Sequence, residues 1–244
     1  MTALLNIDSN AKTIKGQKQG FMTAILYLAP YDLAGVNVCP MAEIAGCIKG
    51  CLNTAGRAGI IKKGEETNQI QRARIARTRL WIEDRDAFMV QLVKELQAFI
   101  RKAGRAGLVP TVRLNGTSDL RWENQAVTVH GIEYRNLMEA FAGVQFYDYT
   151  KIPNRKRLPA NYHLSWSYSE ASERYAAFMP EALAKGMNPV VVFRTKDLPE
   201  TFNGLPVVNG DESDLRFLDP QGVVVGLKAK GKARQDTSGF VVDA

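Results

Sequence analysis

The stretch from Thr23 to Pro30 has the sequence TAILYLAP, and it decides the fold class of the chain. Its apolar residues run without alternation and stop at a proline, which is typical of a strand buried on both faces. Similar apolar stretches return later in the chain, with helical segments between them. The sequence therefore predicts an α/β protein with a mostly parallel sheet, or a partial (β/α) barrel, in a single domain.

The expected elements on either side of this strand alternate between strands and helices. Apolar residues recur near the helical period from residue 66 to residue 105, and the polar run 83–86 divides this part into two helices. Asp84 or Asp86 is the expected N-cap of the second helix. Further helices are expected around 134–142 and at 170–185, and further strands at 111–114, 144–149, 162–168, 190–194, 207–208 and 223–227. Residues 1–20 are expected to form a basic arm or a short edge hairpin before an α/β domain over 21–244.

The composition bounds the class of function. The 244 residues include 32 Lys and Arg against 25 Asp and Glu, a formal net charge of +7. This balance permits an anionic partner such as nucleic acid, a nucleotide or phosphate without requiring one. No apolar run approaches the ~18–20 residues of a membrane span, and the first residues lack a secretory signal, so we expect a cytoplasmic protein. The motifs of P-loop hydrolases and of hydrolases with a serine nucleophile elbow do not occur.

All three cysteines lie in one short segment, GVNVCPMAEIAGCIKGC, within a loop expected at 37–57. An odd number of cysteines argues against a closed disulfide framework. Thiolates select zinc or iron–sulfur clusters, and Cys39, Cys47 and Cys51 would leave one iron of a [4Fe-4S] cluster open to a small molecule. Two alternatives remain. The cysteines are small buried hydrophobes, or they bind zinc together with a further protein ligand.

Polar residues follow several of the expected strands. In parallel α/β sheets the functional groups gather at the carboxyl ends of the strands. We therefore expect the polar residues after the strands to meet the cysteine loop on one rim: Asn115, Thr117, Lys151, Ser167, Glu170 and Arg194. A protein side chain such as Asp148, His163 or Asp211 is the alternative to a small molecule on the open iron.

The cysteine triplet after the first strand of an α/β barrel resembles the layout of radical S-adenosylmethionine proteins, with the wider spacing C-x7-C-x3-C. The resemblance implies a [4Fe-4S] cluster whose fourth iron binds S-adenosylmethionine. If the protein is an enzyme, reductive cleavage of S-adenosylmethionine is then the expected reaction. The cofactor contacts that it implies lie at three strand ends: Asn115, Gly116 and Thr117 at the methionine amino group, Ser167 or Glu170 at the ribose, and Arg194 at the carboxylate.

A second resemblance concerns the family. The segments LAP, GVNVCP, TAGR, RLNGTSD, FYDYTK, HLSWSYSE and GLKAKGKAR are similar to a family of bacteriophage proteins, known from mycobacteriophage genomes and elsewhere. The similarity extends over about residues 23–242. It implies that the protein acts in the cytoplasm of an infected bacterial host, and it implies no activity.

Two basic segments suggest an alternative function. Lys228, Lys230 and Lys232 share one side of an extended chain and are suited to follow phosphates, although they also suit a lysine-protected edge strand. The arginines at 72, 74, 77 and 79 are expected to form a solvated helix face. The alternative is therefore a nucleic-acid-binding or host-modulating accessory protein in which a cluster or a zinc ion only stabilises the fold.

Overall fold

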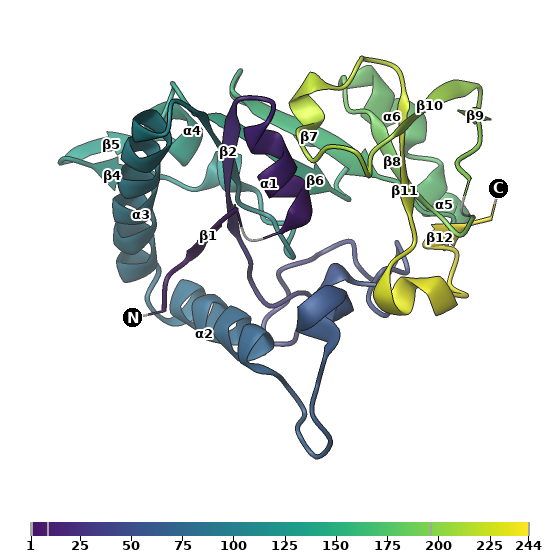
Figure 1. Ribbon diagram of the computed structural model, residues 1–244, viewed down its shortest axis with the longest axis horizontal. Helices are drawn as coiled ribbons and strands as arrows, with labels where there is room; N and C mark the ends of the chain where they lie inside the picture. Colours follow the sequence, from purple (N-terminus) through teal and green to yellow (C-terminus); the bar gives the residue numbers. More distant parts are fainter. Residues whose placement is uncertain (1, 9, 196, 244) are drawn as a thin grey trace.

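The buried strand expected at 23–30 is β2, Phe21–Leu26, and it lies inside the main sheet of the computed structural model (Figure 1). The structure describes residues 2–8, 10–195 and 197–243. Met1 and Ser9 of the expected arm, and Lys196 and Ala244 of the expected domain, lie outside the described residues.

Within the described part of the chain the main sheet has ten strands in the order β1-β2-β3-β6-β7-β8-β11-β10-β9, with β12 beside β8. Pairing is parallel throughout except that β1 and β9 run antiparallel to their neighbours at the two ends. The strands are β1 Leu5–Ile7, β2, β3 Val109–Arg113, β6 Gln145–Thr150, β7 Tyr162–Ser167, β8 Pro189–Phe193, β9 Thr201–Phe202, β10 Leu205–Asn209, β11 Val224–Lys228 and β12 Val241–Val242. A separate hairpin joins β4 Val127–Val129 to β5 Ile132–Tyr134.

The two expected long helices are confirmed. They are α2 Gln69–Glu83 and α3 Arg85–Arg105, and the Asp84 side chain caps α3 by accepting a hydrogen bond from the backbone N–H of Ala87. The helix expected at 170–185 is instead two short helices, because Pro180 starts a new helix more readily than it continues one. The remaining α-helices are α1 Ala11–Gln17, α4 Leu137–Ala140, α5 Glu173–Ala176 and α6 Met179–Ala184. Short 3-10 helices are η1 Leu52–Thr54, η2 Gly56–Gly59, η3 Trp122–Asn124, η4 Arg216–Leu218 and η5 Gly231–Gln235.

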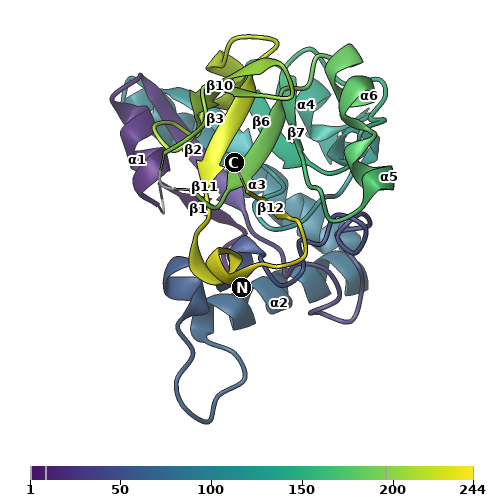
Figure 2. The ribbon, with the colours of Figure 1, turned by 90° about the vertical axis from the view of Figure 1, so that its right-hand side faces the viewer.

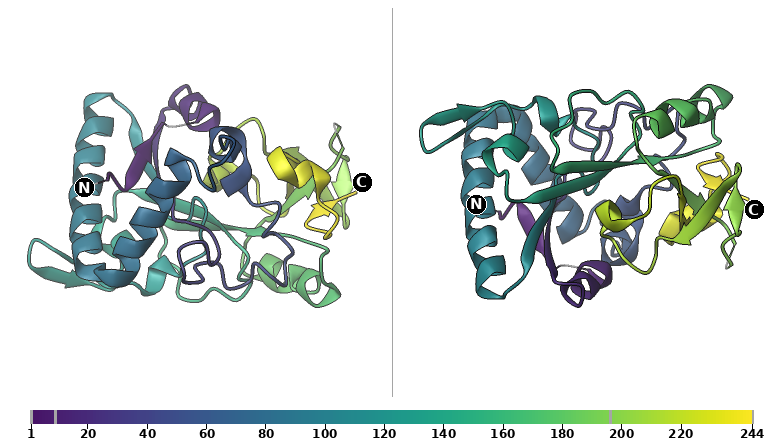
Figure 3. Two further views of the ribbon diagram at one scale, coloured as in Figure 1. Left: turned by 90° about the horizontal axis from the view of Figure 1, so that it is seen from below. Right: turned by 90° about the horizontal axis from the view of Figure 1, so that it is seen from above.

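The two faces of the sheet differ in chemistry. One face of the sheet carries apolar side chains of the main core, against which α3 packs: Ala24 of β2, Val112 of β3, Phe146 of β6 and Leu164 of β7. Figure 3 shows α2 and α3 along one flank of the sheet, with α5 and α6 at the far end. The residues next to these in the sequence point to the other face of the sheet. They include polar groups such as Arg113, and η4 packs over β6 and β7 on that face. One face of the sheet thus covers the apolar core, and the other face covers a polar interior.

The predicted fold class is confirmed as a mixed α/β fold with a large, mostly parallel central sheet. A barrel of the radical S-adenosylmethionine kind is not confirmed, because in the described residues the sheet runs open from β1 to β9. Residues 1–20 contain β1, which extends the sheet beyond β2, and α1, which packs against β2. No helix in the described part of the chain is long and apolar enough to cross a membrane.

Candidate functional site

The loop that contains the cysteines, residues 30–59, lies over the carboxyl ends of the strands. The backbone N–H of Asp119, after β3, donates to the carbonyl of Val38 at 2.8 Å. The hydroxyl of Ser169, after β7, donates to the carbonyl of Ala45 at 2.8 Å. In Figure 1 this loop and the C-terminal segment with η5 lie together along the lower edge of the molecule. The predicted position of the loop at this edge is thus reproduced.

The three cysteines do not form a metal site. Cys39 Sγ accepts from the backbone N–H of Tyr31 and donates to the carbonyl of Thr117, at 3.4 and 3.8 Å. Cys47 Sγ donates to the carbonyl of Ala42 at 3.7 Å, and Cys51 Sγ caps η1. Among the described residues, no group of three or more His, Cys, Asp or Glu side chains is placed to hold a metal ion. The expected [4Fe-4S] cluster, the zinc alternative and the S-adenosylmethionine that depended on the cluster are therefore wrong.

Burial also keeps two of these thiols protonated. It raises the pKa of Cys39 to about 12 and that of Cys51 to about 11, so the thiolate is a minor form of both side chains at neutral pH. The thiols serve instead as weak hydrogen-bonding groups of the loop. The inferred function as an iron–sulfur protein is overturned, and its structural-metal alternative has no support either.

In the turn after β3, where cofactor contacts were expected, the polar side chains are hydrogen-bonded to other groups of the protein. Asn115 Oδ1 accepts from Ser118 Oγ at 2.9 Å and from Trp122 Nε1 at 3.1 Å, and its Nδ2 donates to the carbonyl of Leu120. Gly116 lies so close to β2 that an added Cβ would be 2.8 Å from the carbonyl oxygen of Leu26. The Thr117 hydroxyl donates to the carbonyl of Leu28 at 2.5 Å. These three residues fasten the turn to β2 and to its own loop.

The other three residues that were expected to contact the cofactor each have different partners. Ser167 Oγ accepts from Lys151 Nζ at 2.7 Å. Exposed Glu170 accepts from the hydroxyl of Tyr168 at 3.3 Å. Arg194 forms an ion pair with Asp243 at 2.6 Å and donates to backbone carbonyls of the C-terminal segment. Only Ser167 is linked to the rim under the cysteine loop.

The C-terminal lysines do not form the expected row. Strand β11 ends at Lys228 and η5 begins at Gly231, so the backbone is not extended through Lys232. Lys230 Nζ lies 2.5 Å from Asp211 Oδ1, and the same carboxylate accepts from the backbone N–H of Lys228 at 3.0 Å. A neighbouring carboxylate thus neutralises part of this basic segment, and the geometry offers no support for a nucleic-acid track.

Two cations that the sequence analysis did not single out as ligands lie under the cysteine loop. Arg74 is 7% exposed, and its Nη1 donates to Asn53 Oδ1 at 2.5 Å. Its guanidinium lies 4.8 Å from the ring centroid of Tyr27, and its buried Nε has no hydrogen-bond partner among the described residues. Lys151 Nζ lies 4.7 Å from the ring centroid of Phe240, besides its bond to Ser167. In the described part of the chain neither cation has a carboxylate at ion-pair distance.

Both cations act on the thiol of Cys51. Burial raises the pKa of Cys51, while the positive charges of Arg74 and Lys151 both act to lower it. The expected solvated face of α2 is wrong for Arg74 and also for Arg77, which is 6% exposed and donates to the carbonyl of Ala3 at 2.7 Å. One signal was available in the sequence. The inner face of α2 has few apolar residues, so a packed helix there must bury arginine stems.

A second polar cluster lies on the inner face of the sheet beneath η4. Arg113 and Asp214 form a buried ion pair at 2.9 Å. Tyr147 and Ser165 are fully buried. Within the described part of the chain their hydroxyl groups, and Nε2 of His163, have no hydrogen-bond partner. A charged residue inside the apolar strand sequence TVRL was the signal for this cluster.

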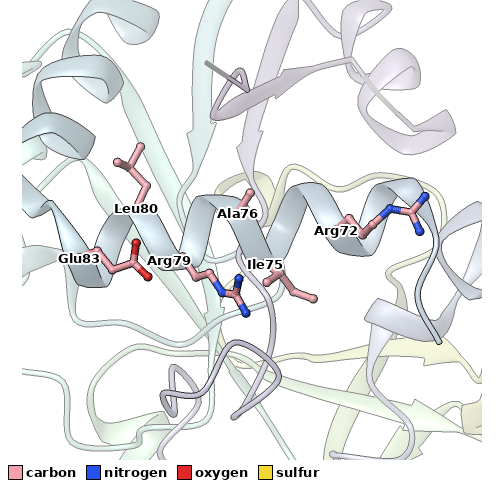
Figure 4. A pocket seen from close by; sticks show the side chains of 6 residues that line it. All are labelled: Arg72, Ile75, Ala76, Arg79, Leu80 and Glu83. Atoms are coloured by element: carbon pink, nitrogen blue, oxygen red, sulfur yellow. The ribbon is translucent and has the colours of Figure 1, made fainter.

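The outer face of α2 forms a shallow hollow on the surface. Figure 4 shows its lining side chains along one stripe of the helix: Arg72, Ile75, Ala76, Arg79, Leu80 and Glu83. The hollow has an apolar middle with charged groups at both ends. It lies on the side of α2 away from Arg74 and is a separate feature from the rim.

Comparison with known proteins gives a family and no activity. A family model described as Gene product 88 matches residues 3–244, which agrees with the bacteriophage family expected from the sequence. No curated protein and no solved structure matches the chain. The radical S-adenosylmethionine resemblance thus has no support from relatives.

Proposed function

The chain belongs to the Gene product 88 family, and from that premise we propose that it binds a small oxyanion, a carboxylate or phosphate group, at the carboxyl ends of its parallel strands. The observation that carries the proposal is that Arg74 and Lys151, two cations under the cysteine loop, have no carboxylate at ion-pair distance. That absence refers to residues 2–8, 10–195 and 197–243.

The charge balance at Arg74 supports an anionic ligand. A cation removed from water is costly unless an opposite charge or several hydrogen bonds compensate it. In the part of the chain that the structure describes, Arg74 contacts the neutral amide of Asn53 and the ring of Tyr27, and its Nε has no partner. A bound oxyanion would accept from Nε and supply the missing negative charge.

The surroundings of Lys151 support the same ligand. Its Nζ is held by Ser167 and lies against Phe240, which leaves ammonium donors for a further acceptor. The pKa of Cys51 is raised by burial and lowered by both positive charges, and its protonated thiol can act as a weak donor to the same anion. The site also occupies the edge at which parallel α/β sheets bind ligands. Ser167, expected from the sequence as a ligand residue, is part of this proposed site.

A thermal unfolding assay tests the proposal. The probes are inorganic phosphate and citrate, each compared with chloride at equal ionic strength. Binding to the folded state alone raises the melting temperature by mass action. We expect at least one probe to raise it in the wild-type protein, and Arg74→Gln and Lys151→Gln to remove that increase.

Matched controls come from α3. Lys94→Gln and Arg101→Gln remove one exposed positive charge each, and both variants should respond to the probe as the wild type does. Circular dichroism establishes that each variant is folded. The proposal fails if neither probe exceeds chloride with the wild-type protein, or if the response persists unchanged in Arg74→Gln and Lys151→Gln.

A further inference from the structure

The segment between β11 and β12 crosses the carboxyl end of β8. Strand β11 pairs with one edge of β8 and ends with Lys228 beside Phe193. Strand β12 pairs with the other edge and places Val242, a residue of the main core, beside the same Phe193. Residues 229–240 therefore leave one side of β8 and return on the other, and Figure 2 shows them with η5 below the ends of β11 and β12. We call this segment the C-terminal arch.

The arch lies where two strands of the sheet separate. The pairing of β7 with β8 ends with Ser167 beside Val190, and further along β8 the neighbour on that edge is β12. The carboxyl ends of β7 and β8 thus part at Ser167, a residue of the proposed anion site. Ligands of open α/β sheets bind in crevices outside the carboxyl ends of the strands. The arch returns to the sheet at such a point.

The end of the arch lies against the proposed anion site. The ring centroid of Phe240 is 4.7 Å from Lys151 Nζ. The same ring lies beside Gly50 of the cysteine loop, where an added Cβ would be 3.0 Å from Cδ1 of Phe240. Ser238 Oγ donates to the carbonyl of Gly46, in the same loop, at 2.9 Å. The arch therefore contacts both the cysteine loop and one of the two cations of the site.

The arch has little attachment to the main core between its two ends. Among residues 230–239, all of which the structure describes, only two are buried. Ala233, Phe240 and Val241 form a small apolar cluster separate from the main core, and half-buried Cys47 packs against it. Segments with few buried apolar contacts open locally at less cost than global unfolding. The arch is thus built to open while the sheet stays folded.

Arg194, the first residue after β8, holds the middle of the arch. Its Nη1 donates to the carbonyl of Arg234 at 3.1 Å, and its Nη2 donates to that of Asp236 at 2.6 Å. Its Nε pairs with the carboxylate of Asp243 at 2.6 Å, in an ion pair that is open to solvent. Loss of this one side chain would therefore release the segment at three points.

We propose that the C-terminal arch is a gate over the anion site and that Arg194 is the latch that keeps it closed. The inference rests on the proposed function, because it states how an anion reaches that same site. In the closed position Phe240 covers Lys151. Opening would move Phe240 aside and expose Lys151 and Cys47. An anion bound beneath the arch is enclosed by it, so its binding shifts the population towards the closed position.

Hydrogen exchange measured by mass spectrometry tests the latch, together with iodoacetamide labelling of Cys47. Arg194→Gln should accelerate both the exchange of residues 230–240 and the labelling by about tenfold or more, because bonds from a charged donor are lost. Asp243→Asn keeps the two bonds to carbonyl groups and should accelerate both by less. Exchange in β3 and β6 should not change. The control is Arg135→Gln, which breaks the exposed ion pair with Glu139 beside β5 and should alter neither measurement.

The same labelling tests the gate. Phosphate or citrate, compared with chloride at equal ionic strength, should slow the labelling of Cys47 in the wild-type protein but not in Lys151→Gln. Unchanged exchange and labelling in Arg194→Gln overturn the latch. An anion that raises the melting temperature without slowing the labelling overturns the gate and leaves the proposed function standing. If neither anion raises the melting temperature, the proposed function fails and the gate fails with it, even where Arg194→Gln opens the arch.

Discussion

Nη1 of Arg113 donates to Oδ2 of Asp214 at 2.9 Å, and the pair joins β3 to a connection 101 residues further along the chain. Both side chains are about 8% exposed. Although burial lowers the pKa of Arg113, the carboxylate of Asp214 holds it above its ordinary value. The ring of Tyr149 lies 4.8 Å from the guanidinium and completes the cluster. This contact fastens the segment with η4 over the polar interior of the sheet.

Asp214→Asn should lower the free energy of unfolding by about 3–5 kcal/mol, because it leaves a buried guanidinium without its counter-ion. Urea denaturation measures this change. The double variant Arg113→Met with Asp214→Leu should lose less than Asp214→Asn, since no charge is left behind. Glu139→Gln breaks an exposed pair with Arg135 and should leave stability nearly unchanged. An Asp214→Asn variant as stable as the wild type would contradict this account.

The stability of the protein should depend on pH through Asp148. Burial raises the pKa of Asp148 from 3.8 to about 7, although its carboxylate accepts from the backbone N–H of Asn115 and from the hydroxyl of Tyr162. The folded state therefore holds a proton that the unfolded chain releases near pH 4. This contribution to stability is complete below pH 4 and is lost as the pH rises through 7.

Melting temperatures of the wild type and of Asp148→Asn across this pH window test the prediction. The asparagine variant does not titrate, so the wild type should lose stability relative to it as the pH rises. A difference between the two proteins that stays constant, or that moves in favour of the wild type, would show that Asp148 is ionised throughout.

Gly116→Ala should destabilise the protein by about 1–3 kcal/mol through overpacking. The added Cβ would lie 2.6 Å from Tyr27, 2.7 Å from Ile25 and 2.8 Å from the backbone oxygen of Leu26, and the backbone cannot move aside cheaply. Gly104→Ala in α3 is the matched control, since no described atom beyond its own stretch of helix lies within 4 Å of its added Cβ. It should instead stabilise by up to about 1 kcal/mol through helix propensity. Chemical denaturation of both variants gives the comparison, and equal effects would refute it.

The thiol of Cys39 should react slowly in the folded protein. Burial raises its pKa from 9.0 to about 12, so its thiolate fraction falls about a thousandfold. Iodoacetamide labelling followed by mass spectrometry measures the rate at each cysteine, with the urea-unfolded protein as reference. Cys51, whose pKa rises to about 11, should be slowed about a hundredfold. Labelling of Cys39 at the same rate in the folded and unfolded states would contradict the burial of this thiol.

The sequence predicted the strands and long helices well because their signals are local. The run TAILYLAP, the helical period through 66–105 and the cap at Asp84 depend on neighbouring residues only. Two short strands at the ends of the sheet, β1 and β9, have weak patterns of two or three residues and were not predicted. Pro180 is also a local signal, but the break that it marks in the helix predicted at 170–185 was not predicted.

The cysteine loop lies at the carboxyl edge of the sheet, but the metal chemistry predicted for it is wrong. The cysteines lie at the carboxyl edge, as the strand order implied, but spacing along a loop does not determine where a thiol points. Cys39, Cys47 and Cys51 each bond to nearby backbone groups, and those bonds depend on how the loop folds. Arg74 was assigned to the solvent because helical period alone does not say which face of an arginine-rich helix is buried.

The sequence by itself determined the α/β class, the alternation of strands and helices and the family, because each of these depends on local sequence patterns and composition. Only the tertiary structure decided which charges are buried together. Arg77 reaches the carbonyl of Ala3, and Arg113 reaches Asp214, through contacts between segments far apart in the chain. Such pairings are fixed by the packing of the whole sheet, and the energy of a charge depends on that packing more than on its sequence neighbours.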